Sequence, residues 1–153
     1  PAPTAPGRAP AKSCARWSQE RYNRPPMNTD EHRYDHDPLS ERVIGCAFTV
    51  ANALGHGYLE KVYENALAHE IRKSGLKCTQ QLSISVTYDG ISVGDYIADL
   101  MVNDELLVEL KAISGLEETH LAQCLNYLKG TGLKTCLLIN FGRPKIQIRR
   151  VSK

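Results

Sequence analysis

The chain has 153 residues, which is enough for one domain with a buried core and short for two. Hydrophobic residues make up 42% and charged residues 24%, a composition typical of globular proteins that argues against wholesale disorder. The formal net charge of +2 does not indicate a nucleic-acid binder, and no apolar run approaches the roughly 20 residues of a membrane-spanning helix.

The cysteines give no sign of a metal or redox motif. There are five of them, and no two form a Cys-x-x-Cys pair. This spacing argues against zinc ribbons and cysteine-ligated iron–sulfur clusters. The simplest interpretation is a reduced, cytoplasmic protein.

The first 38 residues contain seven of the eight prolines and show neither helical nor strand periodicity. Such a stretch cannot bury enough apolar surface to offset the entropy lost on ordering. We therefore predict a disordered tail over residues 1–38 and one folded domain over residues 39–153. Met27 is a candidate native start, in which case residues 1–26 are not native.

Two helices are predicted next. Apolar residues recur at helical spacing over residues 39–54 and 59–71, and glycines follow both segments, as they often do at helix ends. On the second helix the buried stripe is expected to include Leu59 and Val62.

The hydrophobic period then changes from about 3.6 to 2, which is typical of strands. Strands are predicted over residues 82–86 and 91–102, with a hairpin turn at Asp89-Gly90, and over residues 106–111.

The remainder of the chain adds one helix and two strands. The helix is predicted over residues 117–129, with Leu121, Leu125 and Leu128 facing inward, and the strands over residues 134–141 and 146–151. The order ααβββαββ predicts an α+β fold, an α/β sandwich built on a mixed sheet flanked by helices.

Three charged residues interrupt the apolar middle strands. Asp99 alternates with Ala98 and Leu100, and Glu109 shares a face with Lys111. Buried charges must be paired, metal-bound or exposed at a cleft. Two explanations are open at this point: a solvated sheet face on which Glu109 and Lys111 neutralise one another, or a metal site.

The length of the turn between these strands tests the metal site. A two-residue loop at 103–104 would place Asp99 opposite Val108 and point Glu109 to the other face. A three-residue connection at 103–105 would place Asp99 opposite Glu109 instead. Opposed carboxylates are destabilising unless a cation or proton intervenes, so the metal site requires the longer turn.

An Asp on one strand followed by Glu-x-Lys on the next resembles the active site of the PD-(D/E)xK nuclease superfamily. The segment Gly57-Tyr58-Leu59-Glu60-Lys61-Val62-Tyr63 resembles the signature of the GxxExxY proteins, a branch of that superfamily. Further matching segments are Ala98-Asp99-Leu100, Val108 to Ala112, Gln123-x-x-x-Tyr127 and Leu138 to Gly142. The resemblance spans residues 40–151 and implies a PD-(D/E)xK nuclease-like fold.

The resemblance also implies a metal centre. Asp99, Glu109 and the main-chain carbonyl of Leu110 would bind Mg²⁺ (or Mn²⁺), a hard cation that prefers oxygen ligands. Glu60 corresponds to the acid that often joins such a site from outside the strands, and Glu64 one turn later is the alternative. Glu60 could equally be a surface acid stabilised at a helix N-terminus.

The same resemblance assigns roles to other side chains. Lys111 would orient or help deprotonate the attacking water and stabilise charge on the phosphate. Gln123 could hold a water, Lys111 or the substrate backbone, whereas Tyr127 could simply be a packing residue. Ile97 departs from the family, because many relatives carry a basic residue there.

The resulting hypothesis is a Mg²⁺-dependent, nuclease-like phosphodiesterase that hydrolyses DNA or RNA with a metal-activated water. The alternative is a catalytically silent nucleic-acid-binding or protein-interaction module with the same fold. Nucleic acid is the expected partner, a homodimer is possible, and no membrane association is expected. Residues 119–153 carry seven basic residues and no acid, which indicates either a solvated basic edge or a phosphate-binding surface.

Overall fold

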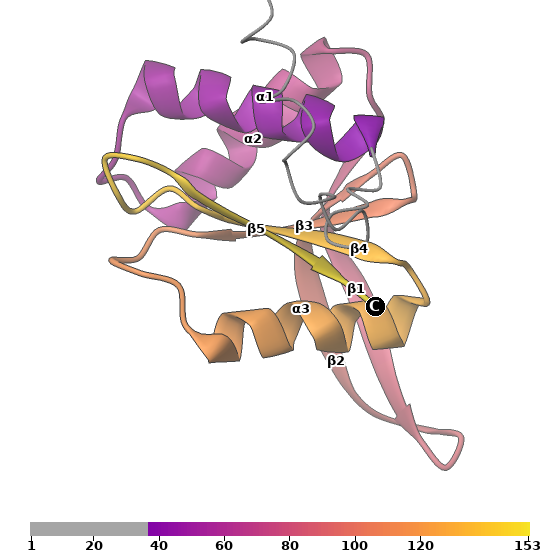
Figure 1. The fold of residues 1–153 in the computed structure, drawn as a ribbon. Coiled ribbons are helices and arrows are strands. Elements are labelled where there is room, and N and C mark those ends of the chain that lie inside the picture. The colour runs from indigo at the N-terminus through magenta and orange to yellow at the C-terminus, as the bar shows by residue number, and fades with distance from the viewer. Residues whose placement is uncertain (1–36) are drawn as a thin grey trace, which may run out of the picture. The chain divides into compact units, whose positions relative to one another are not determined.

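The computed structural model describes residues 37–153, which form three helices and one five-stranded sheet. In chain order the elements are α1 (Pro38–Leu54), α2 (Glu60–Lys73), β1 (Cys78–Tyr88), β2 (Ile91–Val102), β3 (Leu106–Lys111), α3 (Glu118–Thr131), β4 (Thr135–Asn140) and β5 (Gln147–Ser152) (Figure 1). The predicted order ααβββαββ is confirmed. Residues 1–36 of the predicted tail, including Met27 as a candidate start, lie outside the described residues.

The sheet is mixed, as predicted. Its strands lie in the order β1-β2-β3-β4-β5, with β3 and β4 parallel and the other neighbouring pairs antiparallel. Parallel neighbours need a crossover connection, and α3 supplies it between β3 and β4. Helices α1 and α2 cover one face of the sheet, and α3 covers the other (Figure 1).

Each face of the sheet therefore has its own hydrophobic core. On the face covered by α1 and α2, the sheet contributes Leu100, Val102, Leu106, Val108, Leu110, Leu137 and Ile139. On the face covered by α3, it contributes Ile84, Ala98, Met101, Leu107, Cys136, Leu138 and Val151. Because both faces are covered, β3 and β4 are buried almost throughout, which explains their nearly continuous apolar sequences.

Local sequence signals account for the helix start and the hairpin. Asp37 accepts hydrogen bonds from the main-chain N–H groups of Leu39 and Ser40, and so caps α1. Asp89 and Gly90 both have positive φ, 50° and 77°, as the predicted tight hairpin turn requires. No helix within residues 37–153 is long and apolar enough to cross a membrane.

Three residues predicted to face inward are exposed instead. Leu59 is 80% exposed, and Val62 and Leu125 are also exposed. Leu59 has an extended conformation and precedes the first residue of α2, so it does not share the helical stripe. Val62 and Leu125 show that the hydrophobic period locates the buried face of a helix but not the edge of that face.

Candidate active site

The turn between β2 and β3 is the longer of the two alternatives. Val102 pairs with Leu106 and Leu100 pairs with Val108, so residues 103–105 form a three-residue connection. Asn103 and Asp104 adopt positive φ values of 51° and 59°, which these two residue types tolerate well. The paired residues end at Leu100 and Val108, and Asp99 and Glu109 are the next residues along the two strands, in the order that the metal site requires.

The strict alternation predicted for β2 is wrong at Asp99. Ala98 and Met101 pack in the core under α3, whereas Leu100 packs in the core on the opposite face. Across the strand pair, Gln81 of β1 has a φ of 56°, in the left-handed region. A residue in that conformation interrupts the pleat, so the side chains of both strands change faces at this level.

This irregularity frees the Asp99 carboxylate to bind the neighbouring main chain. The N–H of Leu110 donates a hydrogen bond to Asp99 Oδ2 over 2.8 Å. The N–H and C=O of one residue in an extended strand point to the same side, so the Leu110 carbonyl also faces the Asp99 side of β3. Two candidate oxygen ligands thus lie together where β2 and β3 separate.

Glu109 and Lys111 form a buried ion pair on β3. Lys111 Nζ lies 2.7 Å from Glu109 Oε1, and their side chains are only 15% and 3% exposed. The other carboxylate oxygen, Glu109 Oε2, is buried and has no hydrogen-bond partner among the described residues. The solvated-face explanation is therefore wrong for Glu109, although its predicted pairing with Lys111 is present.

Burial and nearby negative charges shift the pKa values of Asp99, Glu109 and Lys111. Burial, with the nearby Asp99 carboxylate, raises the pKa of Glu109 to about 7. Burial and the charges of Glu60 and Glu64 also raise the pKa of Asp99. Burial by itself would lower the pKa of Lys111, but the hydrogen bond and charge of Glu109 outweigh it and raise that pKa. A proton or a cation would relieve the repulsion between the carboxylates.

The two acids of α2 have different environments. Glu64 is buried and accepts hydrogen bonds from Lys61, Gln80 and Gln81. Burial opposes its ionisation, yet these bonds and the charge of Lys61 lower its pKa. Glu60 is half-buried in the first turn of α2, has no hydrogen-bond or ion-pair partner among the described residues, and contributes its charge to the site. Glu60 is therefore the acid of α2 that remains available to a ligand.

On the opposite face, Gln123 and Tyr127 of α3 bind each other. Gln123 Nε2 donates to the Tyr127 hydroxyl, which in turn donates to the main-chain carbonyl of Ile97 over 3.1 Å. Burial and the charge of Glu109 raise the pKa of Tyr127 to about 12. Tyr127 therefore connects α3 to β2 just before Asp99. Among the described residues Gln123 binds Tyr127 and not Lys111, which the sequence had offered as one of its partners.

Asn140 holds the chain that follows Lys111, a role that sequence analysis missed. Its fully buried side chain accepts hydrogen bonds from the N–H groups of Ile113 and Gly142 and donates one to the carbonyl of Ile113. Gly142 lies so close that a Cβ atom there would be 2.2 Å from the nitrogen of Ile113. The signal was a polar residue in an otherwise apolar strand, followed two residues later by glycine.

Comparison with known proteins now adds to this geometry. The sequence model that describes the PD-(D/E)XK nuclease superfamily matches residues 37–151 of this chain. The chain belongs to this superfamily. No curated protein gives a significant match.

One solved structure, SSO0001, shares the fold of this nuclease-superfamily protein at low sequence identity, and a second is similar to it more weakly. The protein SSO0001 is 14% identical with a TM-score of 0.51, and the match covers 76% of this chain and 62% of SSO0001. An alkaline exonuclease (LHK-Exo) from Laribacter hongkongensis is also 14% identical, with a TM-score of 0.43 and coverage of 74% and 82%. The chain thus spans less than two thirds of SSO0001. The α+β, PD-(D/E)XK-like fold expected from the sequence is confirmed.

The donor set of this superfamily member fits a hard divalent cation. Residues 37–153 contain no group of three Asp, Glu, His or Cys side chains placed to hold a metal ion. Mg²⁺, however, is usually bound by only one or two carboxylates and keeps several waters. Asp99, Glu109 and the Leu110 carbonyl meet that requirement, and the unpartnered Glu109 Oε2 is an oxygen that lacks a positive partner.

Proposed function

We propose that this protein is a Mg²⁺- or Mn²⁺-dependent phosphodiesterase that hydrolyses DNA or RNA by attack of water. The observation that carries the proposal is the buried, unpartnered oxygen of Glu109 beside a second carboxylate, Asp99, which raises the Glu109 pKa to about 7. A purely structural ion pair with Lys111 does not need the second carboxylate. We also propose that the chain belongs to the GxxExxY branch, on the basis of residues 57–63.

The proposed metal ligands are Asp99, Glu109 and the Leu110 carbonyl, with Glu60 completing the site from α2. A bound divalent cation would supply Lewis acidity and lower the pKa of a bound water. Glu109 would keep its carboxylate charged for this purpose, because a positive ion favours the ionised form.

The proposed role of Lys111 is to orient the attacking water and to stabilise negative charge on the phosphate. Its ammonium group is held by Glu109 at 2.7 Å, and the carbonyl of Lys111 accepts a hydrogen bond from the N–H of Phe141. The first contact fixes the ammonium group and the second fixes the main chain that carries it, and a charged group must be positioned in this way to be useful in catalysis. Gln123 would act through Tyr127, whose hydroxyl anchors β2 at Ile97, so we regard Gln123 as a positioning residue.

The alternative, a catalytically silent binding module, is favoured by one observation. Lys111 already neutralises one oxygen of Glu109, so the pair could persist without a metal. The two functions differ in metal binding and in turnover, both of which can be measured.

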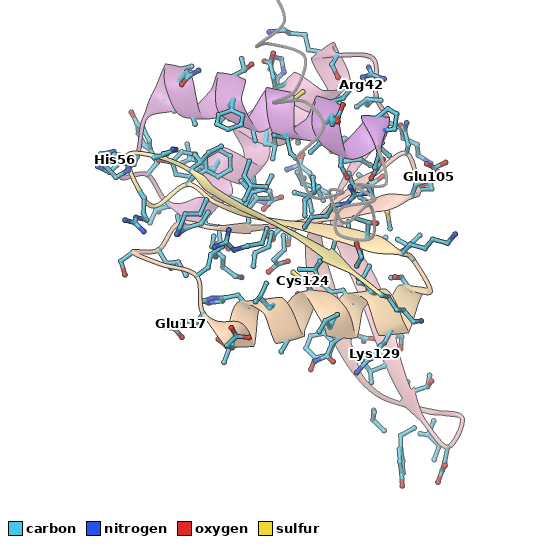
Figure 2. All side chains as sticks on the ribbon, in the orientation of Figure 1. Arg42, His56, Glu105, Glu117, Cys124 and Lys129 are labelled. Atoms are coloured by element: carbon cyan, nitrogen blue, oxygen red, sulfur yellow. The ribbon has the colours of Figure 1, made fainter. Side chains whose placement is uncertain are left out.

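The decisive experiment incubates labelled single- and double-stranded DNA and RNA with the protein and Mg²⁺ or Mn²⁺. We expect cleavage that EDTA abolishes and that Asp99→Asn and Lys111→Ala reduce at least 100-fold, a typical minimum for a group acting in the chemical step. Lys129→Ala is the matched control, because it also removes one lysine. Lys129 is exposed in the last turn of α3, at the opposite end of the helix from Glu117 (Figure 2). Full activity in Lys111→Ala, or calorimetry that detects no uptake of Mn²⁺, would refute the enzymatic proposal.

A further inference from the structure

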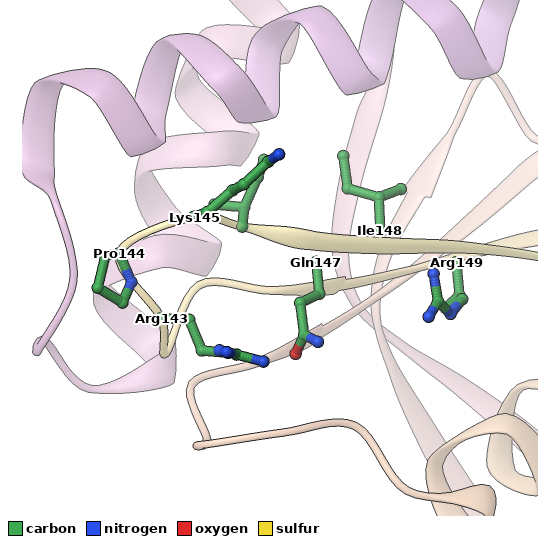
Figure 3. A pocket seen from close by; sticks show the side chains of 7 residues that line it. Arg143, Pro144, Lys145, Gln147, Ile148 and Arg149 are labelled. Carbon is green, nitrogen blue, oxygen red and sulfur yellow. The ribbon is translucent and has the colours of Figure 1, made fainter.

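The hairpin formed by β4 and β5 carries basic side chains without partners. Arg143, Lys145 and Arg149 are exposed and have no hydrogen-bond or ion-pair partner among the described residues. Together with Gln147 they line an open pocket of about 560 Å³. Figure 3 shows Arg143, Gln147 and Arg149 extending from one side of the hairpin and Lys145 from the other.

The sheet register connects this side of the hairpin to the candidate active site. Glu109 of β3 pairs with Leu138 of β4, and Leu138 pairs with Arg149 of β5. Cross-strand partners direct their side chains to the same face, so Glu109 and Arg149 lie on one face, separated by two strand spacings, or about 10 Å.

A second row of cross-strand partners, two residues further along β3, also joins the candidate site to β5. Lys111 pairs with Asn140, and Asn140 pairs with Gln147. The Asn140 amide donates a hydrogen bond to Gln147 Oε1 over 3.0 Å, so Gln147 is already oriented. Each of the two rows therefore runs from a candidate active-site residue to a polar or basic residue on the edge strand. The middle residues of the rows, Leu138 and Asn140, are fully buried, so a bound strand would pass beside the ends of β3 and β4 rather than over the rows.

Charge explains what this edge is suited to bind. The candidate site concentrates the carboxylates Asp99, Glu109 and Glu60 around one lysine, and such a cluster repels phosphate until a cation is present. Residues 119–153, which include the edge strand, contain seven basic residues and no acid. Three of them, Arg143, Lys145 and Arg149, belong to the β4–β5 hairpin and are exposed, so this side of the protein attracts a polyanion.

We infer that Arg143 and Arg149 bind the phosphate backbone of a nucleic-acid strand that extends from the candidate active site across the edge of the sheet. The inference rests on the proposed function and identifies the path of its substrate. A span of about 10 Å corresponds to about three base steps of 3.4 Å along the axis of B-form DNA, and to fewer steps of an extended single strand. The contacts are to phosphates, so DNA and RNA of any sequence share them.

The neighbouring Arg150 provides the matched control. It lies on the same strand with the same charge, but its side chain forms an ion pair with Asp37 at 3.1 Å, beside the start of α1. Arg150→Gln and Arg149→Gln therefore change the net charge equally but remove it from opposite faces of β5, and Arg150→Gln also removes the ion pair with Asp37.

The experiment measures fluorescence anisotropy of labelled 20-nucleotide single-stranded DNA and RNA, with Ca²⁺ in place of Mg²⁺, over a range of salt concentrations. Each phosphate contact contributes about 0.7 to the slope of log affinity against log salt for a single strand. The double variant Arg143→Gln/Arg149→Gln should therefore lower that slope by about 1.4 and weaken binding about 25-fold at 0.1 M salt. Arg149→Gln alone should weaken binding about fivefold, whereas Arg150→Gln, which removes the same charge, should leave affinity within about twofold. Circular dichroism checks that each variant is folded.

The outcomes separate this inference from the proposed function. If the wild type cleaves nucleic acid and the double variant binds as well as Arg150→Gln, the surface assignment is wrong and the activity stands. If the double variant loses binding and the wild type cleaves nothing, the surface assignment stands and the activity is wrong. Equal competition by poly-glutamate of matched charge would overturn the assignment to nucleic acid.

Discussion

The buried carboxylate of Glu109, of which only Oε1 is paired among the described residues, should make the metal-free protein less stable as the pH rises towards neutrality. Its pKa is raised from an ordinary value of 4.5 to about 7, chiefly by burial and then by Asp99. The folded protein therefore holds this proton more tightly than the unfolded chain does. Between pH 4.5 and about 7 the unfolded chain releases the proton first, so the free energy of unfolding falls through that range and levels off above it.

The magnitude follows from the size of the pKa change. Each pKa unit corresponds to 1.36 kcal/mol, so the fall for Glu109 amounts to about 3 kcal/mol. The raised pKa of Asp99 acts in the same direction. The lowered pKa values of Asp37 and Glu64 affect stability only below about pH 4.5, where those groups protonate.

Urea unfolding, followed by far-ultraviolet circular dichroism from pH 4.5 to 8.5 in EDTA, measures this dependence. Glu109→Gln should flatten the pH profile by about 3 kcal/mol, because the amide does not titrate and can still accept a hydrogen bond from Lys111. Glu105→Gln, which changes an exposed carboxyl in the β2–β3 turn (Figure 2), should leave the profile unchanged. Parallel profiles for wild type and Glu109→Gln would refute the argument that ionising this buried carboxyl costs free energy despite its ion pair with Lys111.

Three further predictions concern the metal, the glycine contact and α3. Mn²⁺ at 100 times its dissociation constant should stabilise the wild type at pH 8 by about 2.7 kcal/mol and Asp99→Asn by much less, measured as a shift in the thermal midpoint. Gly142→Ala should cost at least about 2 kcal/mol in urea unfolding, because the added Cβ would meet the main chain of Ile113, whereas Gly115→Ala, where nothing lies within 4 Å, should be nearly neutral. Tyr127→Phe should cost about 1–2 kcal/mol in the same assay, because the carbonyl of Ile97 loses its donor; an unchanged midpoint would show that this bond does not hold α3 to β2.

Much of the fold was predictable because it depends on local patterns. Three such patterns are properties of short segments: the two helical stripes, the change of hydrophobic period after the second helix, and the Asp89-Gly90 turn. The order of elements follows from them. The nearly continuous apolar sequence of β4 likewise reflects burial on both sides. The exposure of Leu59 was not predictable in this way, because a periodic pattern does not mark the residue at which a helix begins.

The sequence by itself determined which residues are candidates for the site. Asp99, Glu109 and Lys111 stand out because charged side chains occupy positions of otherwise apolar strands. Only the tertiary structure decided how they meet. In the structure the turn has three residues, and the alternation of β2 is interrupted at Asp99. Glu64 is bound by Lys61, whereas Glu60 has no partner among the described residues. These outcomes depend on contacts between residues far apart in sequence, and hydrophobic periodicity carries no information about such contacts.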